Sequence, residues 1–223
     1  MEEFCKVLGY NFKNISYLRT ALTHSSYANE RKGIVCNERQ EFLGDSVLSI
    51  IVSDYIFKHC PELPEGELTK LRASLVCEKT LASYARSIDL GSHLLLSRGE
   101  SKSGGRNRPS ILADAFESVI AAIYLDGGME NARKFVLSFV VKDIKNHKTK
   151  RFNDYKTRLQ EIVQKNPEEK ISYVLTGESG PDHDKHFTVE VHLNSNVVGK
   201  GGGRSKKEAE QQAAREALEL MGY

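Results

Sequence analysis

Acidic residues in two otherwise apolar stretches of the chain are spaced so that their side chains could act together. Glu41 and Asp45 are four residues apart, and Asp114 and Glu117 are three apart. On a helix, either spacing places both carboxylates on one face. A carboxylate among apolar residues is costly to desolvate unless a cation or a hydrogen bond compensates it. If the two helices lie side by side, four carboxylates converge, and such an all-oxygen cluster favours a hard divalent cation, Mg²⁺ or Mn²⁺.

Some of these acids also have a simpler interpretation. Glu38 and Glu41 would lie in the first turn of their helix, and Asp114 near the start of its own, where the helix dipole favours an acid. Asp45 and Glu117 lie deeper in their helices, flanked by residues that we expect to be buried. A lone buried carboxylate would destabilise the fold strongly. Convergence of Glu41, Asp45, Asp114 and Glu117 around cations removes that cost for all four.

The elements that must position these acids are helices. Residues 4 to about 140 show helical periodicity, with no convincing strand before residue 170. Asn37 with Gln40 predicts a capping box at the start of one helix. Pro109-Ser110 opens a long apolar helix that ends at Gly127-Gly128, and further helices are expected at 67–75 and about 129–145. The buried face of the helix after Asn37 is predicted to include Phe42, Leu43, Val47, Leu48, Ile51 and Val52.

The pattern changes after residue 145. Residues 146–153 are polar and basic, which predicts a linker. A helix from 154 to about 166 is followed by alternating segments at 170–177 and 185–193, a short strand at 196–199 and a last helix at 205–221. We therefore predict a mainly α domain (1–146), a linker (147–153) and an α+β domain of α-β-β-β-α topology (154–223).

The start of the last helix is basic in an unusual way. Ser205 is a good N-cap residue, and Lys206 and Lys207 follow in the first turn. Their charges oppose the helix dipole, at a cost of a few tenths of a kcal/mol. A solvated surface run is the simpler interpretation of such a cluster. The mismatch is better explained if a phosphate backbone binds at this helix end.

The second domain resembles a double-stranded RNA-binding domain. The resemblance rests on the element order, the Gly180–His183 turn and the run Lys206–Ala209. In such domains the first helix and the turn between the first two strands meet successive minor grooves, while the last helix meets the intervening phosphates. Many members have a basic residue where this chain has Glu210. Carried over by position, the resemblance implies RNA contacts from Gln160, His183, Lys206 and Lys207.

The first domain resembles the ribonuclease III family. The nine residues from Asn37 to Asp45 match its signature, except that Gln40 replaces the usual Leu. The segments 21–25, 100–105 and 111–114 also fit, and so does the order of the two domains. The resemblance implies an Mg²⁺-dependent endonuclease of double-stranded RNA, with Mn²⁺ as a substitute cation. It implies a metal site made of Glu41, Asp45, Asp114 and Glu117, with Asp45 and Glu117 most directly catalytic.

A mechanism and an assembly come with this resemblance. Two metal ions would activate a water and stabilise the leaving 3′-oxygen, which produces 5′-phosphate and 3′-hydroxyl ends. Family members act as homodimers that cut both strands with a short 3′ overhang. Phe42 matches an aromatic residue at the dimer contact, although an ordinary core phenylalanine is an equal alternative. Glu38 and Glu65 match accessory acidic positions.

Two other groups of residues need no catalytic role. The loop 97–108 carries Lys102, Arg106 and Arg108 and could contact RNA; a mobile surface loop is the alternative. A two-metal mechanism requires no nucleophilic side chain. We therefore interpret six histidines as structural or surface residues: His24, His59, His93, His147, His186 and His192.

Composition excludes several classes of protein. The 223 residues are 39% hydrophobic, enough for a core, and no apolar run approaches membrane-spanning length. The acidic start predicts no signal peptide. The four cysteines are widely separated, which argues against zinc and disulfides and favours a reducing cytoplasm. The net charge of +2 alone does not indicate a polyanion partner.

Three functions remain to be compared. The first is endonucleolytic cleavage of duplex RNA, in ribosomal RNA and other structured precursors. The second is non-catalytic regulation through duplex RNA binding, for which four costly carboxylates would have no purpose. The third is hydrolysis of small phosphoesters, which leaves the C-terminal domain unexplained. The first agrees best with the whole sequence.

Overall fold

The structure is a computed structural model that describes residues 1–152, 154–181 and 184–223. It divides into two compact units, Met1–Ile144 and Lys145–Tyr223. Each unit has its own hydrophobic core. No helical stretch within the described ranges combines the length and the hydropathy that a membrane span requires.

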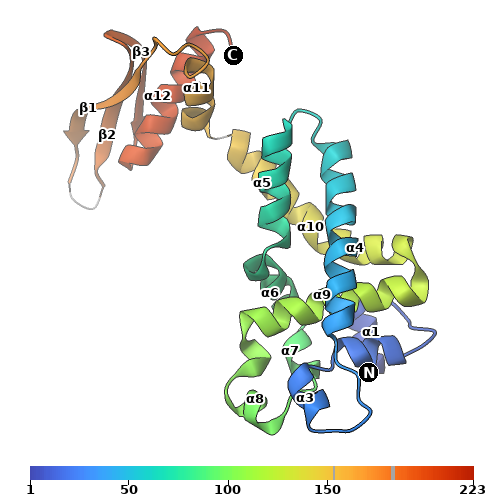
Figure 1. The fold of residues 1–223 in the computed structure, drawn as a ribbon. Helices are drawn as coiled ribbons and strands as arrows, with labels where there is room; N and C mark the ends of the chain where they lie inside the picture. The colour runs from blue at the N-terminus through green and yellow to red at the C-terminus, as the bar shows by residue number, and fades with distance from the viewer. Residues whose placement is uncertain (153, 182–183) are drawn as a thin grey trace. The chain divides into compact units, whose positions relative to one another are not determined.

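The first unit is helical, as predicted (Figure 1). Thr23 and Leu95 join two of its loops in a single parallel β-bridge. α10 continues to Phe152 instead of ending near residue 145, because a helix that is already formed extends readily through Lys and Arg. Residues 147–152 of the predicted linker are thus helical, and Asn153 lies outside the described residues. The helices are α1 (Glu2–Leu8), α2 (Ser16–Ala21), α3 (Ser25–Asn29), α4 (Glu38–His59), α5 (Glu65–Val76), α6 (Glu78–Ser87), α7 (Leu90–His93), α8 (Arg98–Lys102), the 3₁₀ helix η1 (Gly105–Asn107), α9 (Pro109–Gly127) and α10 (Met129–Phe152).

Helix α9 lies at the centre of this unit. It begins with Pro109 at its first position and ends before Gly128, whose φ is 78°. Both residues suit those helix ends. Helices α2, α4 and α6 pack around α9, so that apolar residues on almost every side of it are buried. A long apolar helix was predicted here, and the structure agrees.

Helix α4 packs with most of the predicted face, on which Leu43 is half-buried against the core. Val47, Leu48, Ile51 and Val52 are buried as expected, but Phe42 is 79% exposed. The prediction for Phe42 was wrong because a residue two positions before the buried Gly44 points about 160° away from it on an α-helix. Phe42 is therefore not a core residue.

The predicted capping box at the start of α4 was also wrong. Asn37 occupies the N-cap position without a side-chain cap hydrogen bond. Its Nδ2 instead donates to the carbonyl of Ala21 at 3.2 Å. Gln40 Nε2 donates to the carbonyl of Tyr17, also at 3.2 Å. Both amide side chains are buried, and they fasten the start of α4 to α2.

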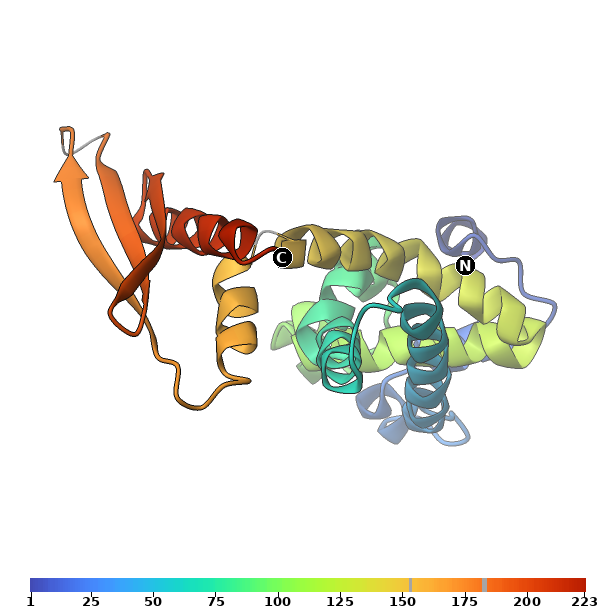
Figure 2. The same cartoon turned by 90° about the horizontal axis from the view of Figure 1, so that it is seen from above.

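The second unit has the predicted α-β-β-β-α order: α11 (Tyr155–Val163), β1 (Ile171–Ser179), β2 (His186–Leu193), β3 (Asn196–Gly203) and α12 (Lys206–Leu220). The strands form an antiparallel sheet in the order β1-β2-β3. Both helices lie on the same side of this sheet (Figure 2). The core between them contains Leu159 and Val163 of α11 and Val189 and Val191 of β2.

Alternate glycines on β3 allow α12 to lie very close to the sheet. A Cβ atom at Gly199 or Gly201 would overlap backbone atoms of α12 around Ala213. The facing side of α12 is built from buried alanines, as the sequence predicted. The strand also runs to Gly203, beyond the predicted end at residue 199. Its glycines therefore serve close helix–sheet packing.

Candidate active site and nucleic-acid interface

The crossing of α4 and α9 rests on a small residue and a buried hydroxyl. A Cβ atom at Gly44 would overlap the backbone carbonyl of Glu117. Ser118 is fully buried, and its Oγ lies 2.8 Å from the Asp114 carbonyl and 3.2 Å from that of Asn37. The sequence reasoning missed both residues. A glycine inside a helix, where it is unfavourable, was the available signal for Gly44.

This crossing brings three of the four predicted carboxylates together. Glu41 of α4 and Asp114 and Glu117 of α9 each offer an oxygen, and these atoms lie within 4.8 Å of one another. All three side chains are half-buried. A site of carboxylate oxygens only, at this separation, suits a hard divalent cation. The donor set therefore fits a metal ion.

The electrostatics of the cluster reflect burial and mutual repulsion. Burial, followed by the negative charges of Asp45, Asp114 and Glu41, raises the pKa of Glu117 to about 8. Burial is also the largest cause that raises the pKa of Glu41 and of Asp114. A bound cation would favour the ionised carboxylates and reverse these shifts.

Asp45 differs from the other three acids. Its neighbours Gly44 and Val47 are buried as expected, but Asp45 itself is exposed, so the prediction that it is a buried carboxylate was wrong. It follows Gly44 on the side of α4 that turns away from the core. Its charge nevertheless raises the pKa of both Glu41 and Glu117, which places Asp45 next to the cluster. Asp45 therefore lies at the solvent edge of the site.

Two further residues, missed by the sequence reasoning, act on Asp114. After burial, the negative charge of Glu78 at the start of α6 raises the pKa of Asp114, whereas His24 lowers it. His24 is the N-cap residue of α3, and its Nδ1 accepts a hydrogen bond from the Ser26 backbone N–H at 3.2 Å. Neither residue shares a sequence spacing with the acids, so only the fold reveals their proximity.

The accessory acids have separate places. Glu38 is exposed in the first turn of α4, and its charge raises the pKa of Glu41. Glu65 is the first residue of α5, where its carboxylate accepts a hydrogen bond from Thr69 Oγ1 at 2.9 Å. It also lines a groove between α4 and α5 together with Ile50 and Phe57.

The loop 97–108 is structured by its own cations. The Arg106 guanidinium donates to the carbonyls of Gly91, Ser92 and Leu94. Arg108 pairs with Glu100 at 2.7 Å. Arg106 thus caps the end of α7, while Lys102 is exposed at the end of α8. Of the three cations predicted to meet RNA, two have structural partners.

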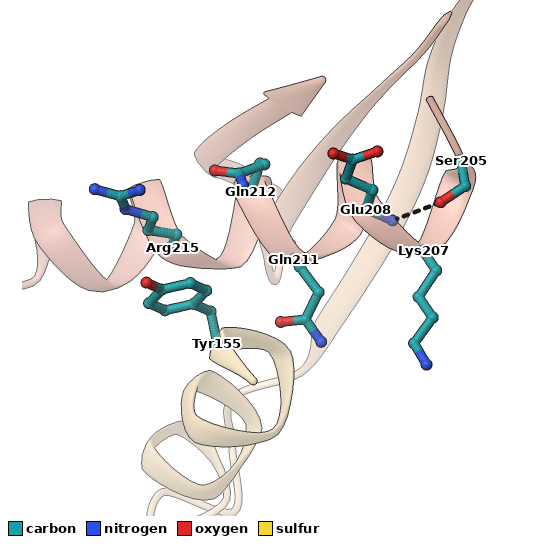
Figure 3. Close-up of a pocket in the computed structure, with 7 residues that line it drawn as sticks. All are labelled: Tyr155, Ser205, Lys207, Glu208, Gln211, Gln212 and Arg215. Carbon is teal, nitrogen blue, oxygen red and sulfur yellow. Dashed lines mark hydrogen bonds between the residues drawn. The ribbon is translucent and has the colours of Figure 1, made fainter. Parts of the chain in front are cut away.

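In the second unit, the predicted cations stand at an exposed helix start. Ser205 caps α12 as expected, with its Oγ accepting from the Glu208 backbone N–H at 3.2 Å (Figure 3). Lys206 and Lys207 are exposed in the first turn, and Gln160 is exposed on α11. His183 lies outside the described residues. Lys207 also lines a recess of about 460 Å³ with Tyr155 and Gln211 (Figure 3).

Glu210 does not leave an uncompensated negative charge on α12. Its Oε2 pairs with Lys156 Nζ of α11 at 2.7 Å. Lys156 Nζ also lies 4.6 Å from the centroid of the Tyr173 ring. The acid that departs from the usual basic residue is therefore part of the contact between the two helices.

A helical domain with an acidic, metal-compatible cluster, followed by an α-β-β-β-α domain with a basic helix start, defines a metal-dependent nuclease of structured RNA. Residues 14–144 match the family model described as Ribonuclease-III-like, and residues 155–221 match the Double-stranded RNA binding motif. The chain belongs to the ribonuclease III family and is an endonuclease of double-stranded RNA.

Individual relatives agree with both matches. Ribonuclease 3 of Desulforamulus reducens is 52% identical over 223 residues, which cover 96% of this chain and 90% of the relative. The nuclease domain of ribonuclease III from Campylobacter jejuni superimposes with a TM-score of 0.60 at 43% identity, covering 64% of this chain and 95% of that one. A second structure of the same domain, at 44% identity and TM-score 0.60, covers 63% and 96%. It is described as showing structural flexibility in a region involved in dimer formation.

Proposed function

We propose that the chain cleaves double-stranded RNA at a site formed by Glu41, Asp45, Asp114 and Glu117, with Mg²⁺ as its cation and Mn²⁺ as a substitute. The convergence of three half-buried carboxylates from α4 and α9 carries this proposal. Oxygen-only donors favour these hard ions over zinc or copper. The RNA-binding motif at residues 155–221 supports duplex RNA as the substrate.

The carboxylates have distinct tasks. Two metal ions held here would supply an activated water and a positive charge for the leaving 3′-oxygen. Glu41 and Asp114 would hold a cation through their half-buried carboxylates. Asp45 and Glu117 are most directly catalytic, Asp45 at the solvent edge where the scissile phosphate arrives and Glu117 in the middle of the cluster. The products carry 5′-phosphate and 3′-hydroxyl ends.

Duplex binding belongs to the second unit in this proposal. Lys206 and Lys207 meet phosphates, and Gln160 and His183 meet successive minor grooves. We assign residues 1–146 to catalysis and dimerisation, 154–223 to RNA binding and 147–153 to their connection. Glu38 and Glu65 are accessory acids in this scheme.

A homodimer completes the proposed enzyme. Phe42, Ile50 and Phe57 are 79%, 56% and 73% exposed along α4. Their spacing places them within one third of the helix circumference. An apolar face of this kind is typical of an interface, and the related nuclease domain has a region involved in dimer formation. Two sites in one dimer would cut both strands and leave short 3′ overhangs.

The substrates we propose are ribosomal RNA, messenger RNA and other structured precursors in the cytoplasm. All four cysteines are free, which agrees with a reducing compartment.

A cleavage assay tests the proposal. Labelled duplex RNA and its separated single strand are incubated with the protein in Mg²⁺ or EDTA and analysed on a denaturing gel. We expect only the duplex in Mg²⁺ to be cut. Glu117→Gln should abolish cutting and retain duplex binding, whereas Glu3→Gln, a matched change at an exposed acid, should retain both cutting and binding. Equal cutting of single strands, or full activity of Glu117→Gln, would contradict the proposal.

A further inference from the structure

The side chain of Gln211 on α12 joins two groups at the start of α11. Its Nε2 donates to Asp154 Oδ1 at 2.9 Å, and its Oε1 accepts from the Lys156 backbone N–H at 3.0 Å. Asp154 is the N-cap residue of α11 and also accepts from the backbone N–H and Oγ1 of Thr157. Both halves of one amide therefore bind the first turn of the neighbouring helix.

The adjacent residue on α12 adds a second link. Glu210 pairs with Lys156 Nζ at 2.7 Å, so Lys156 is held through both its backbone and its side chain. Partial burial raises the pKa of Asp154, but hydrogen bonds from Gln211 and Thr157 outweigh it and leave that pKa below its usual value. The carboxylate thus remains ionised as the acceptor for Gln211. We call these four residues, Asp154, Lys156, Glu210 and Gln211, the interhelix clamp.

The clamp lies one helical turn from the proposed RNA contacts on α11 and α12. Gln211 is four residues after Lys207 on α12, and Gln160 is four residues after Lys156 on α11. Residues four apart on a helix share a face. Gln211 and Lys207 both extend from α12 toward the side where α11 begins at Tyr155 (Figure 3). The clamp therefore connects the two surfaces that would touch the duplex.

We infer that Gln211 is a positioning residue for duplex RNA binding, which fixes the start of α11 against the start of α12 at the spacing that the duplex requires. The inference rests on the proposed contacts of Gln160, Lys206 and Lys207. Duplex RNA is recognised by shape, through contacts in separate grooves. A fixed spacing avoids the entropic cost of ordering those contacts during binding.

The apolar core supplies only part of this constraint. Tyr155, the first residue of α11, is half-buried against the core, and Leu159 and Val163 are buried beyond the first turn. These contacts hold α11 in place, but apolar contact is non-directional. Directional hydrogen bonds at the first turn are what set its rotation and its position along α12.

The test uses the full chain in EDTA, with the affinity for labelled duplex RNA measured across a salt series. Gln211→Glu keeps the acceptor for Lys156 but places a carboxylate against Asp154. We expect about tenfold weaker binding, corresponding to the loss of one partly buried hydrogen bond. Gln212→Glu is the matched control, because it adds the same charge one residue away on an exposed side chain that also lines the recess. It should weaken binding about twofold or less, through charge alone.

Exchanging the carboxylate of Asp154 and the amide of Gln211 between the two positions should restore duplex affinity. The double variant Asp154→Asn with Gln211→Glu has the net charge of the original chain, and the Asn amide can donate to the new carboxylate while its oxygen still accepts from Thr157. We expect duplex affinity to return to within about twofold of the original, a difference well below the worth of one hydrogen bond. Far-UV circular dichroism melts accompany every variant. A purely structural role would lower the melting temperature and leave affinity unchanged at temperatures where the variant is folded.

The results distinguish a failure of the inference about Gln211 from a failure of the proposed RNA contacts. If Gln211→Glu binds like Gln212→Glu, or the folded double variant stays as weak as Gln211→Glu, the inference is overturned. Should Gln211→Glu fail to fold, Gln211→Met against Gln212→Met makes the same comparison without added charge. Lys206→Ala with Lys207→Ala should weaken binding and reduce the salt slope by about 2. Unchanged binding by that lysine variant would instead reject the proposed RNA surface, on which the inference depends.

Discussion

The two units build their functional surfaces by opposite means. In the first, like charges are forced together at a helix crossing, half-buried and without a cation of the protein's own among their hydrogen-bond partners in the described residues. In the second, cations stand exposed at a helix start, and neutral or paired polar groups hold the helices beneath them. The first surface carries electrostatic repulsion that a bound cation would relieve, whereas the second presents exposed positive charge.

Gly44→Ala should have the largest effect. It should impair cleavage by the first unit and leave duplex binding by the second unit unchanged. A Cβ atom would overlap the Glu117 carbonyl and push α4 away from α9. The steric cost of about 1–3 kcal/mol exceeds the gain of about 1 kcal/mol in helix propensity. Displaced carboxylates should lower the cleavage rate about a hundredfold, while duplex binding by the second unit stays unchanged.

Gly66→Ala is the matched control, since a Cβ there meets nothing within 4 Å. It should leave cleavage unaffected. Wild-type cleavage by Gly44→Ala, measured under single-turnover conditions, would show that the close helix approach does not position the carboxylates.

Two buried or half-buried glutamines allow a second comparison. In the first unit, Gln40 Nε2 donates a hydrogen bond to the Tyr17 carbonyl, but the buried Oε1 of Gln40 has no hydrogen-bond partner within the described residues. Gln211 in the second unit uses both atoms. Gln40→Leu should therefore stabilise the protein by about 1 kcal/mol, while Gln211→Leu destabilises it by a similar amount.

Urea unfolding of each unit, followed by separate probes, measures this difference. If Gln40→Leu destabilised the first unit, the bond to Tyr17 would be worth more than the unpaired oxygen costs. The contrast between the two glutamines would then disappear.

A third prediction is a pH dependence of the stability of the first unit in the absence of metal. The pKa of Glu117 is about 8 in the folded protein against an ordinary value of 4.5. Its contribution to stability is fully present below about pH 4.5 and is lost as the pH rises through about 8, because the fold then holds an ionised carboxylate among like charges. The melting temperature in EDTA should therefore fall between pH 5 and pH 8.

Glu117→Gln should flatten this pH dependence, and Glu3→Gln should preserve it. Addition of Mg²⁺ should raise the melting temperature more at pH 8 than at pH 6, because a larger fraction of the Glu117 carboxyl groups is deprotonated at pH 8. A melting temperature in EDTA that rises over this range in the original chain, but not in Glu117→Gln, would contradict the predicted sign.

Much of the architecture could be predicted because it depends on local patterns. Pro109 and Gly128 bound α9 as expected, Ser205 caps α12, and the alanine side of α12 predicted its close packing. These features follow from dihedral preference, capping and side-chain size within a few residues. The end of α10 was misjudged, because basic residues that favour a linker in isolation extend a helix already formed.

The angular relation of the acids within each helix follows from the sequence alone. Glu41 with Asp45, and Asp114 with Glu117, share a face because 3.6 residues complete a turn. The side of α4 that turns inward depends instead on tertiary packing, which leaves Asp45 and Phe42 in solvent and Gln40 in the core. Helical periodicity sets angles between residues of one helix, but the rotation of that helix against its neighbour depends on contacts such as Gly44 with Glu117. Such contacts join residues far apart in the chain, and no local pattern records them.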